Sequence, residues 1–361
     1  MSEVRDIKKG GDELFEQLKK LAPGTELRQG IELILHARTG GLIVIGDYEN
    51  VQPLCDGGFE VTAPFSANTL AELAKMDGAI ILDDNLQKVL KVNVHLMPNP
   101  EISTSETGTR HRTAERVSKQ TNALVIAISE SKDLVSVYYR GKKYVLEDIR
   151  TLLSKANQAL QTLERYRYRF DQESRKLTAV EFQEIVTLSE VISTIQRAQM
   201  LLEVAREIER YIALLGSEGR LIKLQLDELI AGIDEEYSLI IMDYKRTKKE
   251  AGEIRNKIDE LTPQELLEEL KIARILGYAS DPSVLEEVVV PRGYRALKKI
   301  PRLPMPVIEN IVKNYGNLSN ILRASVSDLD DVEGVGEVRA RSVVEGLQRL
   351  RDTSLKEIAP I

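Results

Sequence analysis

The sequence of 361 residues is poor in the residues that cross-link small scaffolds: it has one cysteine, Cys55, and three histidines. A single cysteine cannot form an internal disulfide, and this set does not make a zinc finger of the usual four-ligand kind. These scarcities exclude disulfide-rich domains and domains built on structural zinc.

Long hydrophobic runs are also lacking. The longest, such as residues 123–128 and 238–242, are far shorter than the ~20 apolar residues that a membrane-spanning helix needs. The first residues, Met-Ser-Glu-Val-Arg-Asp, precede no apolar stretch, so a secretory signal is not expected. We therefore expect a cytoplasmic protein without a membrane span.

Charge is unevenly divided along the chain. Residues 291–361 contain 12 Lys and Arg against 9 Asp and Glu, a net charge of +3, which leaves −10 of the total −7 to residues 1–290. With 42% hydrophobic and 30% charged residues, the chain is typical of folded protein, and its length predicts two or three domains. A basic end on an acidic body indicates that only the end approaches a polyanion.

Three segments differ in composition and in the spacing of their apolar residues, and together they predict a multidomain α/β plus all-α protein. Residues 1–148 alternate helical patterns with short β-rich runs at 41–46, 78–82, 123–129 and 134–139, which is typical of an α/β domain with a mixed sheet. Residues 291–361 carry short helical patterns separated by proline and glycine, which predicts a compact bundle of small helices.

Residues 149–290 between them have few glycines and prolines and a helical spacing of apolar residues, which predicts a helical linker, or oligomerisation spine, without chemistry of its own. Thr178 ahead of Glu181 predicts one helix start, and Thr262-Pro263-Gln264-Glu265 predicts another with a capping box. Breaks are expected near Gly216 and Gly277.

Two short segments of the first domain carry groups that handle phosphate: residues 76–82, with Asp77 and Gly78, and residues 105–116. In the second, arginines flank a histidine just after Gly108 and just before a helical stretch, which places cationic forks and helix N-terminal N–H groups around one anion. No Gly-x-x-x-x-Gly-Lys-Ser/Thr loop is present. The residues alone also allow a plain solvated helix start and a simple turn into a strand.

The segments MDGAIIL, SETGTRHRTAERVSKQT and LVIAISES, with RTGGLIVIGD upstream, resemble the diadenylate cyclase family. The whole chain resembles the DisA family of bacterial DNA-integrity scanning proteins. That resemblance implies a mixed-sheet cyclase domain, a helical spine and a small C-terminal helix-hairpin-helix domain. It implies condensation of two ATP into cyclic di-AMP and two pyrophosphates with Mg²⁺ or Mn²⁺, in a homo-octamer whose cyclase domains face one another.

The resemblance also assigns roles to residues. Asp77 is expected near the ribose 3′-hydroxyl, and Asp77 and His111 are candidate metal ligands. The expected catalytic set is Asp77, Arg110, His111 and Arg112. The expected nucleotide-binding set is Gly78, Leu96, Gly108, Thr109, Arg110, His111, Arg112, Thr113 and Ser129.

Elementary chemistry agrees with these roles. A 3′-hydroxyl is a poor nucleophile at neutral pH, so a carboxylate such as Asp77 that accepts or orients its proton, together with a divalent ion, lowers the barrier. Arg110 and Arg112 would stabilise charge on the phosphoryl oxygens and the leaving pyrophosphate. One motif binds one nucleotide, so two bonds require at least two chains.

The last domain contains a second motif, Gly334-Val335-Gly336, within residues 329–347, which resemble a helix-hairpin-helix. A tight hairpin of this kind presents N–H groups to a DNA phosphate independently of base sequence, and we expect DNA contacts at Gly334, Val335, Gly336, Arg339 and Arg341. Residues 297–312 lie where a first copy would be, with prolines in place of its glycines. Proline has no N–H, so the sequence leaves phosphate binding by that copy open.

The sequence leaves two functions open. The first is a cyclase that senses DNA structure, with branched DNA as the expected partner. The alternative is a DNA-binding scaffold that holds ATP without turnover, or a DNA-processing ATPase.

Overall fold

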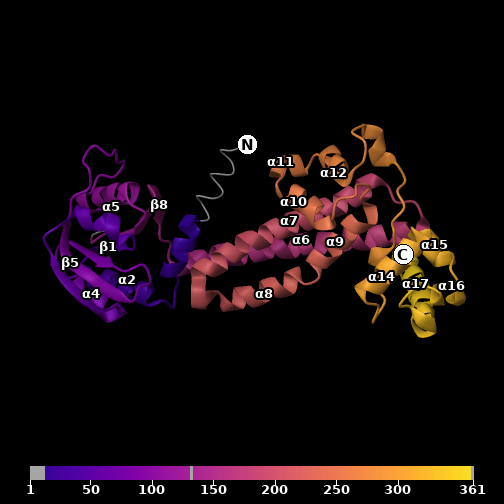
Figure 1. Cartoon of the computed structure of the whole chain (residues 1–361), viewed down its shortest axis with the longest axis horizontal. Helices are drawn as coiled ribbons and strands as arrows, with labels where there is room; N and C mark the ends of the chain where they lie inside the picture. Colours follow the sequence, from indigo (N-terminus) through magenta and orange to yellow (C-terminus); the bar gives the residue numbers. More distant parts are fainter. Residues whose placement is uncertain (1–12, 131–132, 359–361) are drawn as a thin grey trace. The chain divides into compact units, whose positions relative to one another are not determined.

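The structure is a computed structural model that describes residues 13–130 and 133–358 (Figure 1). It divides into two compact units, which are described separately. The first unit comprises Met1–Asn157 and Glu209–Lys223, and the second comprises Gln158–Ile208 and Leu224–Ile361.

The first unit is built on a mixed eight-stranded sheet in the order β2-β5-β4-β1-β6-β7-β8, with β3 paired to β5. The parallel neighbours β1 and β4 lie at its centre, and β1 pairs antiparallel with β6 on its other side. The strands are β1 (Gly41–Ile45), β2 (Cys55–Asp56), β3 (Phe59–Pro64), β4 (Ala79–Leu82), β5 (Lys88–Leu96), β6 (Leu124–Ile128), β7 (Val135–Tyr139) and β8 (Lys142–Val145). The four predicted β-rich runs are β1, β4, β6 and β7.

Helices cover both faces of this sheet, because its central strands are apolar on both sides. On one face α2 (Glu26–Ala37) and α4 (Ala67–Leu73) bury Ile31, Ile34 and Leu70 against the strands. On the other face α5 (Thr109–Gln120) buries Ala114 and Val117. Short helices α3 (Tyr48–Val51), η1 (Lys19–Leu21) and η2 (Gln52–Leu54) complete the unit. The predicted mixed-sheet α/β fold is confirmed.

The middle of the chain is helical, as predicted. Its elements are α6 (Ile149–Gln183), α7 (Leu188–Leu215), η3 (Gly216–Gly219), α8 (Arg220–Ile230), α9 (Ile233–Tyr244), α10 (Ala251–Asp259), α11 (Pro263–Leu266), α12 (Glu269–Leu276) and η4 (Pro282–Glu286). The capping box of Thr262 and Glu265 is present at the start of α11. Helix α7 ends at Leu215 and α12 ends before Gly277, so both expected breaks are confirmed.

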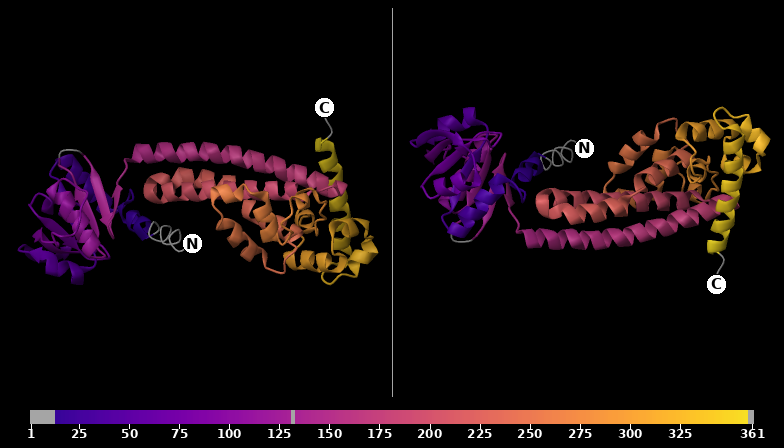
Figure 2. Two further views of the ribbon diagram at one scale, coloured as in Figure 1. Left: turned by 90° about the horizontal axis from the view of Figure 1, so that it is seen from above. Right: turned by 90° about the horizontal axis from the view of Figure 1, so that it is seen from below.

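The predicted helix start at Thr178 is wrong. Figure 2 shows α6 as one unbroken helix, and Thr178 lies inside it. The Thr178 hydroxyl donates to the carbonyl of Ser174 at 2.9 Å, the local bond by which threonine is tolerated within a helix.

The C-terminal domain is a bundle of short helices around one apolar core. Its helices are α13 (Tyr294–Lys298), α14 (Met305–Tyr315), α15 (Leu318–Arg323), α16 (Val326–Asp330) and α17 (Gly336–Ile358). Phe182, at the end of α6, belongs to the same core. The domain therefore packs directly on the linker within the second unit.

A buried ionic cluster joins the C-terminal domain to the linker. Arg295 of α13 is 1% exposed; its guanidinium lies 2.6 Å from Glu181 of α6 and 2.7 Å from Glu236 of α9. The carboxylate of Asp243 accepts the backbone N–H groups of residues 293, 294 and 295. Burial would raise the pKa of Glu236, but Arg295 holds it below its usual range.

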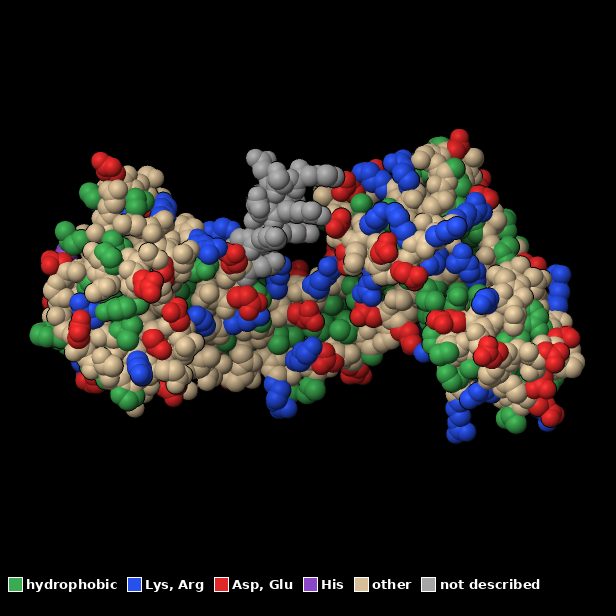
Figure 3. All heavy atoms as spheres, in the orientation of Figure 1, with side chains coloured by type: hydrophobic (Ala, Val, Ile, Leu, Met, Phe, Trp, Pro, Cys, Tyr) green, Lys and Arg blue, Asp and Glu red, His purple; other side chains and the backbone are tan. Residues whose placement is uncertain are grey.

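Surface charge on the second unit is mixed rather than segregated. Figure 3 shows acidic and basic side chains interspersed, with Lys and Arg gathered over α12 on the face drawn. Basic side chains are thus not confined to the C-terminal domain.

Candidate functional site

Asp77 and Gly78 form the turn that leads from α4 into β4. Gly78 has φ +91°, and a Cβ there would lie 2.8 Å from the backbone of Asn93 and of Val94 in β5. Only glycine accommodates both this backbone conformation and this close approach. The side chain of Asp77 is exposed beside the turn.

The predicted helical stretch is present as α5, but it begins at Thr109, so Arg110 and Arg112 lie in its first turn and do not precede it as expected. Gly108 is the N-cap and supplies no side-chain cap, so the first N–H groups of the helix keep their capacity to bind a ligand. Arg110 donates from Nη1 to the carbonyl of Ile128 at 3.2 Å. Gly40 lies against this guanidinium, where a Cβ would come within 2.6 Å of Nη1. Arg112 is exposed and makes no side-chain hydrogen bond or ion pair with a described residue.

A pocket of about 260 Å³ brings the two phosphate-handling segments together. Of the predicted residues, those that line it are Asp77, Gly78, Leu96, Thr109, Arg110 and Thr113. Residues 108, 111, 112 and 129 are not in its lining. Leu96 ends β5 and is 5% exposed, so it forms part of the pocket's apolar wall.

Several other residues that line this pocket were not among the predicted site residues. They include Thr39 and Gly40 ahead of β1, Gly41 at its first position, and Lys75, Met76 and His95. The hydroxyl of Thr39 is buried and has no hydrogen-bond partner among the described residues. A buried unpaired hydroxyl is costly, so a bound ligand that hydrogen-bonds to it would remove that cost. Thr39 and the Gly-Gly pair lie within RTGGLIVIGD, one of the segments that resemble the cyclase family, and that resemblance was the signal for this side of the pocket.

His111, in the first turn of α5, is held by a chain of polar groups. Its Nδ1 lies 3.0 Å from the hydroxyl of Tyr138, and Glu106 forms an ion pair with Lys143 at 2.7 Å. Burial, followed by the charge of Glu106, raises the pKa of Tyr138 and keeps its hydroxyl protonated. Burial alone would raise the pKa of Glu106, but hydrogen bonds from Lys143 and Tyr138 lower it.

Helix α5 also fixes the loop that precedes its own N-terminus. Glu115 is 7% exposed and accepts from the hydroxyl of Thr104 at 2.5 Å and the N–H of Ser105 at 3.1 Å. Arg116 donates to the carbonyl of Ile102 at 2.9 Å and to that of Pro100 at 2.8 Å. Glu115 and Arg116 therefore hold residues 100–105 against α5.

Metal ligands are sparse around the site. Within the described part of the chain, His, Cys, Asp and Glu side chains do not gather in groups of three or more that could hold an ion. Asp77 contributes one exposed carboxylate to the pocket. A divalent ion there would need oxygen ligands from a bound phosphate, which is the usual way in which Mg²⁺ is held.

The second predicted motif forms a hairpin between α16 and α17. Gly334 and Gly336 have φ +85° and +65°, and Val335 between them is 3% exposed. Ala340 is fully buried, as close packing of the hairpin requires. Arg339 donates to the carbonyl of Gly334 at 2.6 Å. Arg341, the other arginine expected at DNA, forms an exposed ion pair with Glu337 at 3.0 Å.

Comparison with known proteins agrees with this architecture. Residues 28–143 match the family model described as DisA bacterial checkpoint controller nucleotide-binding, and residues 146–285 match that of the DisA bacterial checkpoint controller linker region. The chain is 53% identical to the DNA integrity scanning protein DisA of Carboxydothermus hydrogenoformans over 93% of this chain and 96% of that protein. It is 49% identical to DisA of Bacillus subtilis over 94% of each chain.

The chain belongs to the DisA family. Because the relatives match nearly from end to end, the family assignment covers the C-terminal domain as well as the nucleotide-binding domain and the linker. Every helix in residues 13–130 and 133–358 is too short or too polar to cross a bilayer.

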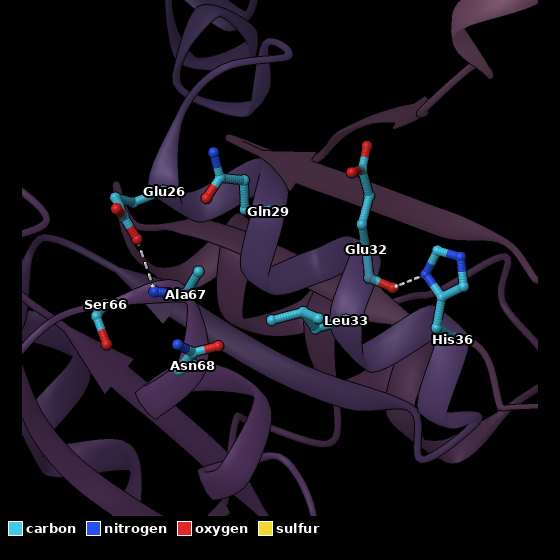
Figure 4. A pocket seen from close by; sticks show the side chains of 8 residues that line it. All are labelled: Glu26, Gln29, Glu32, Leu33, His36, Ser66, Ala67 and Asn68. Atoms are coloured by element: carbon cyan, nitrogen blue, oxygen red, sulfur yellow. Dashed lines mark hydrogen bonds between the residues drawn. The ribbon is translucent and has the colours of Figure 1, made fainter.

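A larger pocket of about 450 Å³ lies elsewhere on the nucleotide-binding domain of this DisA family member (Figure 4). It is lined by Glu26, Gln29, Glu32, Leu33, His36, Ser66, Ala67 and Asn68 from α2 and the start of α4. Glu26 accepts the N–H of Ala67 at 2.8 Å, and His36 Nδ1 lies 2.7 Å from the carbonyl of Glu32. None of the predicted site residues lines it, and the carboxylate of Glu26 holds the start of α4 to α2.

Proposed function

We propose that the chain is a diadenylate cyclase that condenses two ATP into cyclic di-AMP and two pyrophosphates. The observation that carries this proposal is the pocket in which Asp77 and Gly78 meet Thr109, Arg110 and Thr113. A carboxylate and a phosphate-binding helix start in one pocket are what attack of a ribose hydroxyl on a phosphate requires.

Different residues act at the ribose and at the triphosphate of the nucleotide. Asp77 accepts or orients the proton of the 3′-hydroxyl, whose oxygen attacks the α-phosphorus of the opposing ATP while the bond to pyrophosphate breaks. Gly78 lets the backbone approach the nucleotide, and Leu96 packs against it. The triphosphate lies at the start of α5, among Gly108, Thr109, Arg110, His111, Arg112 and Thr113, with Ser129 nearby.

The guanidinium of Arg110 is positioned by its hydrogen bond to the carbonyl of Ile128, so its charge is in place before the transition state forms. Mg²⁺ or Mn²⁺, held by Asp77 and phosphate oxygens, with His111 as a further candidate ligand, would neutralise charge on the phosphoryl oxygens. The Tyr138 contact fixes the ring of His111 in one orientation.

Synthesis of two phosphodiester bonds needs two sites face to face. The pocket gathers one set of these residues, so the active unit contains at least two chains, and the homo-octamer implied by the family resemblance satisfies this. We place the enzyme in the cytoplasm, where ATP and chromosomal DNA are both available.

The relatives are named for DNA integrity scanning, and the C-terminal hairpin supports DNA binding here. Gly334, Val335 and Gly336 form a tight turn ahead of α17 whose backbone suits a phosphate irrespective of base sequence. We propose that branched DNA is the preferred partner and that its binding lowers cyclase activity, whereas short linear duplex does little. Binding weakens as salt rises, because it rests on phosphate contacts.

The test is incubation of the full chain with ATP and Mg²⁺ or Mn²⁺, followed by chromatography. Cyclic di-AMP supports the cyclase, ADP indicates the ATPase alternative, and unchanged ATP indicates a non-catalytic scaffold. Asp77→Asn is the matched variant: it should bind ATP, because the arginines remain, and make no product. Near-normal turnover by Asp77→Asn would remove Asp77 from the mechanism.

The DNA arm of the test compares cyclase activity with branched and linear DNA at matched concentrations. A point substitution at Gly336 is a better control than removal of the C-terminal domain, because removal would leave buried Glu181 without Arg295. Equal effects of both DNAs, or inhibition that persists in the Gly336→Asp variant, would contradict the proposed coupling; aspartate tolerates the positive φ of residue 336, has room for its Cβ, and repels a phosphate.

A further inference from the structure

The C-terminal domain contains an internal repeat with an offset of 32 positions. Helix α13 (Tyr294–Lys298) and helix α16 (Val326–Asp330) begin and end at residues that are 32 apart. Buried apolar residues recur at the same offset: Leu297 and Leu329, Ile300 and Val332, Leu303 and Val335, Ile308 and Ala340, and Ile311 and Val343. All ten lie in one core.

Backbone hydrogen bonds repeat as well. The N–H of Leu297 donates to residue 293 at 3.0 Å, and the N–H of Leu329 donates to residue 325 at 3.1 Å. The N–H groups of Ile300 and Val332 donate to the carbonyls of Leu297 and Leu329, respectively, at 3.0 and 3.1 Å. Residues 293–311 therefore fold as a first hairpin that is equivalent to the second hairpin, residues 325–343.

The tips of the two hairpins share a backbone path but differ in chemistry. Arg302 has φ +63° where Gly334 has φ +85°, and buried Leu303 takes the place of buried Val335. Pro304, with φ −69°, stands where Gly336 provides an N–H. The first tip thus lacks one of the backbone donors on which the second is expected to depend.

The conformation of this turn does not explain why residue 302 is an arginine. An arginine seldom adopts the left-handed conformation, and glycine or asparagine would adopt it with less strain. Its side chain is exposed and makes no hydrogen bond or ion pair with any residue that the structure describes. The neighbouring basic residues are engaged, since Lys298 pairs with Glu235 and Lys299 donates to Thr178.

We infer that Arg302 makes the first hairpin a second phosphate contact of the same DNA-binding surface, with its guanidinium in place of the missing N–H donor. A guanidinium presents five donors in a fork that matches phosphate oxygens and reads no base. Two hairpins of one rigid core then hold two phosphates of a duplex. This inference rests on the proposed DNA binding by the second hairpin.

The experiment measures binding of the full chain to a fluorescent duplex and a four-way junction by anisotropy, across about 50 to 300 mM salt. Arg302→Ala should weaken binding to both DNAs about fivefold or more, and it should reduce the slope of log K against log salt by about 0.9. Arg302→Gly should do the same while relieving the strained backbone, so it separates loss of the contact from loss of folding. Arg302→Lys should retain most of the slope.

Arg323→Ala is the matched control, an exposed arginine at the end of α15 in the same domain, and it should leave affinity and slope unchanged. If Arg302→Gly binds like the native chain while Gly336→Asp loses binding, the first hairpin makes no contact and the inference is wrong. If the native chain binds neither DNA, the proposed DNA binding itself fails. An equal loss in Arg323→Ala would also overturn a specific role for Arg302.

Discussion

Replacing Arg295 with methionine should destabilise the joint between the linker and the C-terminal domain. Methionine keeps the unbranched aliphatic part of the side chain but removes the guanidinium, with its charge and its donors. The backbone N–H groups that bind Asp243 stay in place. The change therefore isolates the guanidinium.

The expected loss is about 4 kcal/mol. Glu181, whose side chain is 2% exposed, would remain buried without its cation, and breaking a buried ion pair from one side costs about 3 to 5 kcal/mol. Glu236 loses the same partner, but its side chain is 19% exposed and water can compensate in part. Adding Glu181→Gln removes the stranded charge, so the double variant should be more stable than the sum of the single effects predicts, by about 2 kcal/mol.

Hydrogen exchange read by mass spectrometry is the suitable assay, because unfolding of a chain with two compact units has no single free energy. Peptides that span α13 and the last turns of α6 report the local free energy of opening. Arg323→Met is the control and should change it by less than about 0.5 kcal/mol. A loss below about 1 kcal/mol in Arg295→Met, or strict additivity in the double variant, would refute the reasoning.

Replacing Arg110 and Arg112 together with alanine should weaken ATP binding at least tenfold by calorimetry, since two charge-assisted contacts to phosphate are lost; unchanged affinity would place the phosphate site elsewhere. Thr39→Val should weaken nucleotide binding by about 1 kcal/mol without loss of stability, because it removes a buried hydroxyl that has no described protein partner; a loss of stability instead would show that the hydroxyl is already satisfied. Burial raises the pKa of Asp243 to about 7, so its contribution to stability is full below about pH 4 and is lost as pH rises through 7. Between pH 5 and 8 the free energy of opening should therefore fall by roughly 3 kcal/mol in the native chain relative to Asp243→Asn, and parallel pH profiles would contradict this.

The sequence by itself determined the local elements and the chemistry of the motifs. The apolar run Leu124–Ile128, which is rich in β-branched residues, was predicted as a strand and is β6, and the capping signals of Thr262 and Glu265 act within one turn. The helix after Gly108 was likewise predicted, although α5 begins at Thr109, four residues before the expected helical stretch. These features depend on neighbours within a few residues, so composition and spacing reveal them.

Only the tertiary structure decided which distant residues meet. Thr39 and Gly40 reach the pocket because β1 lies between β4 and β6 in the sheet, an order that no spacing encodes. Thr178 looked like a helix start because its sequence neighbours fit one, whereas its hydroxyl receives Lys299 from the C-terminal domain. Arg295 forms an ion pair with Glu181, which lies 114 positions earlier in the chain. Among the described residues of the second unit, Arg295 is the most deeply buried charged side chain, and it contacts a linker for which the sequence predicted no chemistry. Burial strengthens such long-range contacts, and burial is a property of the folded chain alone.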